Sequence, residues 1–242
     1  MNKRIPRSYE VIGDILIFSD FPKNKKLAEK YLNNHIKVIT KKSKNFSGKY
    51  RLPKLKILAG EKRKTTIHIE NQIKLKVNPE KAYFSSKLSS ERLRIAKQVK
   101  KTEKVLVMFS GIAPFPITIY KHSKPKEIHA IEINPKAHKL AQENLKLNKI
   151  KNIYLYKGNV KKVLPKLKKF DRIVMPAPKN ADQFLDLALK HLNKKGIIHL
   201  YTFAREEDFK ELKNKYKKFK PKLKKCGQTS PRIYRVCLDL KT

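Results

Sequence analysis

The chain has 242 residues, 40% of them hydrophobic, and its 60 lysines and arginines outnumber 20 acidic residues, for a formal net charge of +40. This length allows one large domain or two smaller ones with a real core. The positive charge favours a polyanionic partner, nucleic acid first, because each neutralised phosphate releases counterions. A lysine-rich proteome is the alternative explanation for part of that charge.

The sequence predicts neither a secreted nor a membrane protein. The first ten residues are basic, but no apolar segment follows them as in a signal peptide. The uncharged segment 105–120 is shorter than the roughly 20 residues that span a bilayer and contains one glycine and two prolines. Cys226 and Cys237 have neither a metal-binding nor a disulfide-framework spacing. We therefore expect a cytoplasmic protein with no membrane contact and no metal.

Residues 1–100 are predicted to form a small α+β domain. Short segments with alternating apolar residues favour strands. One amphipathic helix lies among them, and a second helix, over 89–99, bridges into the rest of the chain. The predicted strands are EVIGDILIF, IKVIT, KLKILAG, TTIHIE and IKLKVN, and the predicted helices are NKKLAEKYLNN and SSERLRIAKQV.

Residues 101–242 alternate apolar strands with amphipathic helices about five times, which predicts an α/β Rossmann-like domain with a parallel sheet. The C-terminal part of this pattern includes a long basic helix over 206–219 and a last strand over 232–240. The earlier strands are KVLVMF, EIHAIEI, NIYLYKG, FDRIVMPAP and GIIHLYTF, and the helices between them are PITIYKHS, PKAHKLAQENLKLN, VKKVLPKL and ADQFLDLALKHL.

The loops after the first two of these strands carry residues suited to a nucleotide. Gly111 permits a tight turn through which backbone N–H groups can face an anionic group. Glu132 ends the second strand 21 residues later. This spacing fits the roughly 20 residues expected for a carboxylate that binds a ribose diol. An ordinary strand-to-helix turn and an exposed Glu near a helix start are the structural alternatives.

The loops after the third and fourth strands give weaker indications of a nucleotide-binding site. Asn159 either bonds an adenine amino group or makes a turn. Pro176 and Pro178 fix an extended loop whose free carbonyls can accept hydrogen bonds from a base, or which is merely rigid. In the first domain, Glu91 follows two serines at a helix start, where the helix dipole is a sufficient structural reason for it.

Eight segments follow one another over nearly the whole chain: GKYRLPKLKILAG, AYFSSKLSSER, VMFSGIAPFPI, IEINPKAHKLAQENLKLNKI, GNV, FDRIVMPAPKNADQFLDLAL, GIIHLYTF and CGQTSPRIYRVCLDL. In this order they resemble the archaeal and eukaryotic tRNA (guanine-N1)-methyltransferases, which use S-adenosylmethionine on the guanosine 3′ of the anticodon. The wybutosine-pathway aminocarboxypropyltransferase is a close relative with the same fold and cofactor. The resemblance implies a cytoplasmic monomer that binds the anticodon stem-loop of tRNA.

The resemblance also implies site residues. The catalytic pair falls on Arg51, which would stabilise charge on the guanine O6, and Glu91, which would be the general base. The target nucleotide would meet Tyr83, Lys87, Arg92 and Arg232. The cofactor would meet Phe109, Ser110, Gly111, Ile112, Pro114, Glu132, Ile133, Asn159, Val160, Pro176 and Pro178.

The chain departs from the family pattern at several of these places. Ala113 stands where a second glycine is usual, and we expect it to avoid positive φ. Val107 and Asn159 replace acids, Pro176 replaces an Asn, and Lys87 replaces an arginine. Each change removes a polar contact or adds bulk, so the expected effect is weaker cofactor binding.

Four functions compete on these observations. The first is methylation of guanosine N1 in tRNA, favoured by the SSER segment and the Rossmann segments. The second is another transfer at the same nucleotide, either of an aminocarboxypropyl group or of a methyl group to the tricyclic base. The third is a basic RNA-binding protein without catalysis. The fourth is methylation of another RNA or of DNA.

Overall fold

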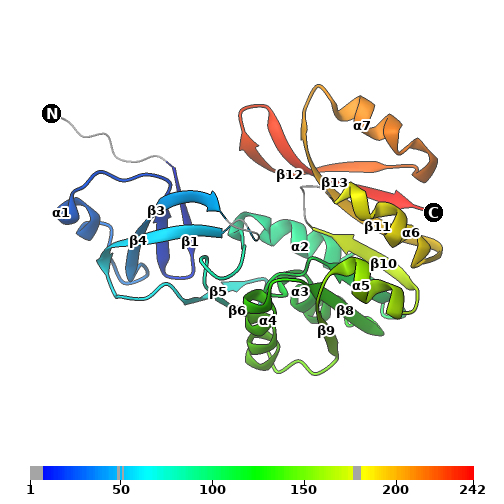
Figure 1. The fold of residues 1–242 in the computed structure, drawn as a ribbon, viewed down its shortest axis with the longest axis horizontal. Coiled ribbons are helices and arrows are strands. Elements are labelled where there is room, and N and C mark those ends of the chain that lie inside the picture. The colour runs from blue at the N-terminus through cyan, green and yellow to red at the C-terminus, as the bar shows by residue number, and fades with distance from the viewer. Residues whose placement is uncertain (1–7, 48–49, 51, 177–180) are drawn as a thin grey trace.

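The structure is a computed structural model that describes residues 8–47, 50, 52–176 and 181–242 (Figure 1). Among these residues the strands form a four-stranded sheet, a two-stranded sheet and a seven-stranded sheet. The four-stranded sheet belongs to the N-terminal part and the seven-stranded sheet to the C-terminal part (Figure 1). This architecture confirms the predicted fold class, an α/β Rossmann-like domain preceded by a small α+β domain.

The N-terminal sheet has the order β1-β2-β3-β4. β1 and β2 form an antiparallel hairpin, and β3 runs parallel to β2 because the helix α1 lies in the connection between them. Asn24 caps α1 by accepting a hydrogen bond from the Leu27 amide. α1 ends at Glu29, so the helix predicted over 24–34 is shorter than expected. The bounds are β1 (Tyr9–Ile12), β2 (Ile15–Phe18), α1 (Lys25–Glu29), β3 (Val38–Ser47) and β4 (Leu52–Gly60).

A short hairpin connects this sheet to the second part. Its strands, β5 (Thr66–Glu70) and β6 (Ile73–Val77), pair only with each other among the described strands. β5 contacts β1, whereas β6 contacts helices α3 (Pro114–Ser123) and α4 (Pro135–Leu147) of the second part. Because the hairpin touches both parts, the division predicted between residues 100 and 101 stays a prediction.

The large sheet has the order β12-β13-β11-β10-β7-β8-β9. The five strands from β11 to β9 are parallel, and β13 and β12 are added antiparallel at one edge. The strands are β7 (Lys104–Met108), β8 (Glu127–Glu132), β9 (Ile153–Lys157), β10 (Phe170–Met175), β11 (Leu192–Arg205), β12 (Lys222–Ser230) and β13 (Ile233–Lys241).

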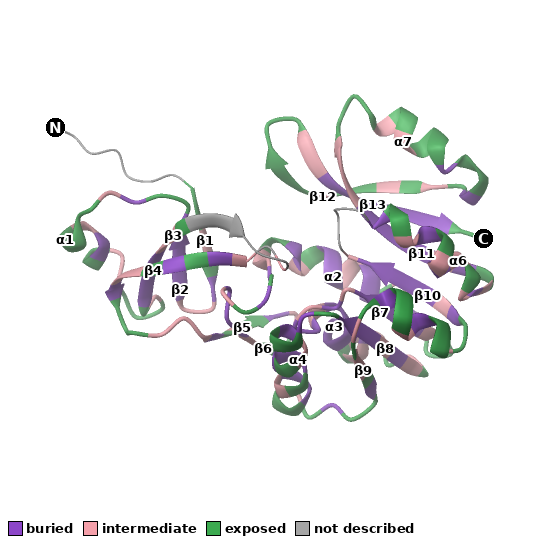
Figure 2. Cartoon of the chain, in the orientation of Figure 1, coloured by how far each residue is buried: buried purple, intermediate pink, exposed green. Residues whose placement is uncertain are grey.

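Helices cover both faces of this sheet, and alternate residues of β7 show why. Val105 and Val107 lie in one apolar cluster with α2, α3 and α4, whereas Leu106 and Met108 lie in a second cluster with α5 and α6. Figure 2 shows the central strands buried and the outer helix faces exposed, with the edge strand β12 largely exposed. The remaining helices are α2 (Ser89–Ala96), α5 (Val160–Val163), α6 (Leu185–Lys190), α7 (Phe209–Lys215) and the 3-10 turns η1 (Ser86–Leu88), η2 (Leu164–Lys166), η3 (Asp182–Phe184) and η4 (Lys217–Phe219).

The C-terminal edge corrects two expectations. The basic helix predicted over 206–219 is only the α7 helix followed by the turn η4. The strand β12 was not predicted, because its lysines and polar residues hide any alternation of apolar side chains. Within the described residues, no helix is long and apolar enough to cross a membrane.

Candidate active site

The turn after β7 has an unusual backbone. Phe109, Gly111 and Ala113 all have positive φ, of 56°, 58° and 67°. The expectation that Ala113 avoids positive φ is therefore wrong. The left-handed geometry at Ala113 lets its amide donate to the Ser110 carbonyl while its own carbonyl accepts from Ile117 in the first turn of α3. This backbone costs roughly 1–2 kcal/mol at a non-glycine residue, and the surrounding hydrogen bonds offset it.

Glu132 ties this turn to the end of β8. One carboxylate oxygen accepts the Gly111 amide and the other accepts the Asn134 amide, each at 2.7 Å. Burial raises the pKa of Glu132, and these backbone hydrogen bonds oppose the rise. The carboxylate thus lies at the carboxyl ends of β7 and β8, where nucleotides bind in α/β sheets.

Other groups around this edge fit a nucleoside. The Ser110 hydroxyl is buried and bonds to no described residue. Ile133, the residue after Glu132, is 38% exposed and offers an apolar surface for a flat ring. Asn159 caps α5 by accepting from the Lys161 amide, and Val160 is buried behind it.

The remaining predicted cofactor residues lie around the same turn. Ile112 is buried and Pro114 begins α3. Phe109 packs edge-on against Phe184, with 5.0 Å between ring centroids. Pro176 is half-buried directly after β10, and Pro178 lies outside the described residues.

The segment before α2 crosses this edge of the sheet. The Asn134 side chain donates to the Lys81 carbonyl. A Cβ atom added at Gly111 would lie 3.7 Å from the Tyr83 carbonyl oxygen. The nucleotide-binding edge and the segment around Tyr83 are therefore direct neighbours.

Tyr83 also lines a cavity of about 280 Å³, which we call the Tyr83 cavity. Its walls come from the N-terminal sheet, the segment before α2 and the β12–β13 hairpin, and the first and last of these both contact η1. The lining residues are Glu10, Ile12, Ile17, Lys42, Pro53, Pro79, Ala82, Tyr83, Phe84, Ser85, Lys87, Cys226, Gly227, Gln228, Thr229 and Arg235.

Glu91 lies in the first turn of α2 and is only 5% exposed. Arg94 donates to both of its carboxylate oxygens, at 2.7 and 2.8 Å, and the Tyr201 hydroxyl donates at 2.6 Å. Burial raises the pKa of the neighbouring Cys226 thiol, and the Glu91 charge adds to the rise. Cys226 lines the Tyr83 cavity and Glu91 does not, so Glu91 lies behind the wall of that cavity.

A chain of buried charges continues behind Glu91. Arg94 also donates to both oxygens of Asp239, and Asp239 accepts from His199 Nδ1 at 2.6 Å. The other His199 nitrogen faces Arg172, which is paired with Glu103. His199, Cys237 and Asp239 lie close enough together to suggest a metal site. The two arginines, however, already supply the positive charge that a cation would bring.

Replacement of Asp239 by Asn should destabilise the protein at neutral pH by about 1.5–3 kcal/mol, the scale of a hydrogen bond to a charged group. Its hydrogen bonds with His199 and Arg94 outweigh burial and lower the pKa of Asp239. The stabilisation is therefore complete above the unfolded value, near pH 4, and is lost as pH falls through the folded value. Urea unfolding at several pH values should show wild type and variant converging in acid. A difference that is constant with pH would contradict this assignment.

The other predicted residues lie in different surroundings. Arg51 is outside the described residues. Arg92 is buried and makes a two-pronged ion pair with Glu70, which leaves it 1% exposed. Lys87 is exposed at the Tyr83 cavity, and Arg232 is exposed at the turn between β12 and β13. The structure thus brings Tyr83 and Lys87 to one cavity, with Glu91 behind its Cys226 wall. Glu132 is bonded to Gly111, which neighbours the Tyr83 backbone.

Comparison with known proteins shows which family this chain belongs to. A family model described as the TRM5/TYW2 methyltransferase domain matches residues 66–228, and one described as the TYW2 N-terminal domain matches residues 1–64. The chain belongs to the TRM5/TYW2 methyltransferase family. The first match alone covers more than half of the chain.

Individual relatives in this family carry related names. The chain is 34% identical to tRNA (guanine(37)-N(1))-methyltransferase Trm5b of Pyrococcus abyssi, over all of this chain and 76% of the relative. It is 35% identical to tRNA 4-demethylwyosine(37)-methyltransferase Taw21 of Saccharolobus solfataricus, over 96% of this chain and 92% of the relative. Among solved structures, a complex of aTrm5 with tRNALeu aligns with a TM-score of 0.84 at 35% identity, over 97% of this chain and 72% of that one.

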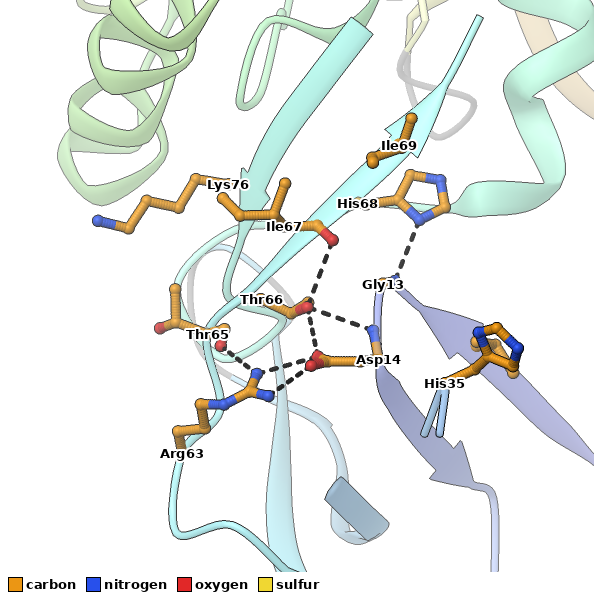
Figure 3. Close-up of a pocket in the computed structure, with 11 residues that line it drawn as sticks. Gly13, Asp14, His35, Arg63, Thr65, Thr66, Ile67, His68, Ile69 and Lys76 are labelled. Carbon is orange, nitrogen blue, oxygen red and sulfur yellow. Dashed lines mark hydrogen bonds and ion pairs between the residues drawn. The ribbon is translucent and has the colours of Figure 1, made fainter. Parts of the chain in front are cut away.

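A larger cavity, of about 680 Å³, lies between the β1–β2 and β5–β6 hairpins. Figure 3 shows that Arg63, Thr66 and Asp14 point at one another and that His68 points at the Gly13 amide. Arg63 donates to both oxygens of Asp14, Thr66 donates to Asp14, and the Gly13 amide donates to His68. These bonds hold the two hairpins together, so we assign this cavity to structure rather than to catalysis in the TRM5/TYW2 fold.

Glu132 should be the strongest single cofactor contact in the methyltransferase domain. Replacement by Gln keeps the size of the side chain but loses the charge that two ribose hydroxyls would meet, and also one of the two backbone hydrogen bonds, because an NH2 group cannot accept from the Gly111 or the Asn134 amide. Loss of a charged hydrogen bond of about 1.5–3 kcal/mol should weaken S-adenosylmethionine binding roughly 10- to 150-fold in calorimetry. Glu127→Gln, at the opposite end of the same strand, is the matched control. Equal affinity of the Glu132 variant and wild type would remove Glu132 from the cofactor site.

Proposed function

We propose that this chain transfers a methyl group from S-adenosylmethionine to N1 of the guanosine 3′ of the tRNA anticodon. The observation that carries the proposal is a buried carboxylate, Glu91, held beside a nucleotide-sized cavity that adjoins a nucleotide-binding sheet edge. The relatives named tRNA (guanine(37)-N(1))-methyltransferase in Pyrococcus and Methanocaldococcus support the choice of nucleotide.

The cofactor would lie along the turn Phe109–Ala113, with its ribose on Glu132, its adenine near Ile133 and Asn159 and its polar end near Ser110. S-adenosylmethionine supplies an electrophilic methyl group when bound. The chain's own task is to place the base opposite that methyl group and to manage one proton. In this arrangement the Tyr83 segment borders both sites, and the methyl group and the base would meet beside it.

Guanine N1 is a poor nucleophile while it carries its proton. Glu91 would accept that proton as N1 attacks, which is general-base catalysis worth roughly 10²–10⁴-fold. Arg94 and Tyr201 fix the carboxylate, so one of these contacts must loosen for the base to bind. Arg51 is proposed to stabilise the negative charge that builds on O6, as an oxyanion hole does. N1 lies on the pairing edge, so the base must leave the stack, and Tyr83 would receive it.

We propose no substrate role for Arg92, because its guanidinium is buried against Glu70. Arg232 and Lys87 are exposed cations suited to the RNA backbone. We further propose that the protein acts as a monomer in the cytoplasm of an archaeon and without a metal ion. The archaeal sources of the relatives named above support the organism, and the absence of a metal follows from the methyl transfer itself, which needs none.

The test is nucleoside mass spectrometry after incubation of the protein with S-adenosylmethionine and an unmodified tRNA that carries G after the anticodon. We expect 1-methylguanosine, and none in a tRNA with A at that position. Modification of neither tRNA, with cofactor binding intact, would overturn the proposal.

A second function is kept because one observation favours it. The N-terminal match is to the TYW2 family, and relatives include a tRNA(Phe) (4-demethylwyosine(37)-C(7)) aminocarboxypropyltransferase at 32% identity and Taw22, named for both guanine and 4-demethylwyosine methylation. Under this function the same cavity would accept a tricyclic base. A tRNA that already contains that base should then be modified faster than unmodified tRNA.

A further inference from the structure

A buried arginine on β13 has no acidic partner among the residues that the structure describes. Arg235 is 9% exposed, and it makes no ion pair with any carboxylate in the described part of the chain. Its Nε atom is buried without a hydrogen-bond partner. Burying a charged group without a partner is costly, so a position like this calls for a ligand.

The surroundings of Arg235 aim it at the Tyr83 cavity. Nη2 donates to the Tyr83 hydroxyl at 2.8 Å, and the guanidinium lies 5.4 Å from the centre of the Phe203 ring. These contacts fix the plane of the guanidinium and supply no negative charge. Arg235 lines the cavity together with the cations Lys42 and Lys87, against the single acid Glu10.

The one acidic residue that lines the cavity, Glu10, already accepts hydrogen bonds from another residue. Glu10 Oε1 accepts hydrogen bonds from the amide and the hydroxyl of Ser86, at the start of the turn η1. It therefore makes no ion pair with Arg235. Ser85 and Thr229 also line the cavity, and the Thr229 hydroxyl donates to the Ile233 carbonyl. Cations, hydroxyls and a fixed guanidinium together match the oxygens of a phosphodiester.

We infer that Arg235 binds a backbone phosphate of the RNA at or next to the target nucleotide, and that its bond to Tyr83 couples this phosphate to the residue that receives the base. The inference rests on the proposed function for the RNA itself. A phosphate fits better than a base carbonyl, because the Arg235 charge has no carboxylate partner among the described residues and a neutral base would leave it uncompensated.

The first test compares Arg235→Gln with Lys241→Gln, which removes the same charge from an exposed position at the far end of β13. tRNA affinity is measured over a series of salt concentrations. We expect Arg235→Gln to weaken binding roughly 10-fold or more and to flatten the salt slope by about 0.7–0.9, the value of one phosphate contact. The loss should be equal for tRNAs with G or A at the target position. Lys241→Gln should keep the wild-type slope.

A second test changes the RNA, and compares wild type with the Arg235→Gln variant whose folding is checked by cofactor binding. A tRNA ligated from synthetic pieces carries one neutral methylphosphonate, placed in turn at each phosphate around the target nucleotide. At one position wild-type binding should fall, and Arg235→Gln should show no further loss there. An unchanged affinity at every position would overturn the inference. So would a loss in Arg235→Gln confined to tRNAs with G, since that marks base recognition.

Failure of the inference and failure of the proposed function are distinguishable. If wild type methylates guanosine while Arg235→Gln keeps its affinity and salt slope, only the phosphate site is wrong. If wild type binds no tRNA, the proposed function itself is wrong. Cofactor binding by Arg235→Gln should equal that of wild type in either case, and it reports that the variant is folded.

Discussion

Replacement of Glu91 by Gln should slow methyl transfer in a single turnover by roughly 10²–10⁴-fold, the scale of general-base catalysis. The amide cannot take the N1 proton. It keeps the size of the carboxylate and one oxygen that can accept from Arg94 and Tyr201, while its NH2 group loses the second hydrogen bond from Arg94. Cofactor affinity should stay within a few fold, because Glu132 and not Glu91 lies at the sheet edge. The measurement is rapid-quench transfer with saturating tRNA and labelled cofactor.

Two control variants distinguish the loss of the general base from the mere loss of a negative charge and from a shift in the position of the Glu91 side chain. Glu143→Gln removes one carboxylate from the surface of α4 and should not change the rate. Tyr201→Phe removes one hydrogen bond to Glu91 and should slow transfer much less than Glu91→Gln does. A Glu91 variant as fast as wild type would show that another group takes the proton.

Replacement of Arg92 by Leu should destabilise the protein by about 3–5 kcal/mol, because it leaves the Glu70 carboxylate buried without its partner. The guanidinium donates to both oxygens of Glu70 and also to the Ser85 carbonyl. His68, 3.4 Å from the same carboxylate, is too weak a replacement. Guanidinium chloride unfolding would measure the loss.

The double variant, Glu70→Leu with Arg92→Leu, tells a structural role from a substrate role. Two apolar residues in a buried site replace the pair without stranding a charge, so most of the lost stability should return. Methylation by the refolded double variant should then approach that of wild type. A stable double variant without tRNA binding would instead favour the predicted contact between Arg92 and the substrate.

The parallel part of the fold follows from local patterns in the sequence. Continuous apolar runs such as Val105–Met108 predict strands buried on both faces, and the helices between them have apolar stripes that cover those faces. The antiparallel edge of the sheet, β12 and its pairing with β13, could not be predicted from such local patterns. β12 is held by its pairing with β13, a contact from outside the segment that overrides its lysine-rich composition.

Parts of the candidate site could be predicted from the sequence where the spacing between two residues is itself informative. Glu132 was predicted from its spacing to Gly111, and the structure joins the two by a hydrogen bond. Its role in cofactor binding stays a prediction. Arg232 was predicted and Arg235, which lines the Tyr83 cavity, was not, although strand alternation places Arg235, Cys237 and Asp239 on one face of β13. The backbone of Ala113 was mispredicted because local rules penalise positive φ there, whereas hydrogen bonds of the turn impose it.

The most direct measurement uses S-adenosylmethionine in two labelled forms, one with the label in the methyl group and one with the label in the aminocarboxypropyl group. The protein is incubated with each form and an unmodified tRNA with G after the anticodon, and the nucleosides are then separated. The account predicts methyl label alone, in 1-methylguanosine. Aminocarboxypropyl label in the RNA, or methyl label only in a tricyclic nucleoside, would contradict it.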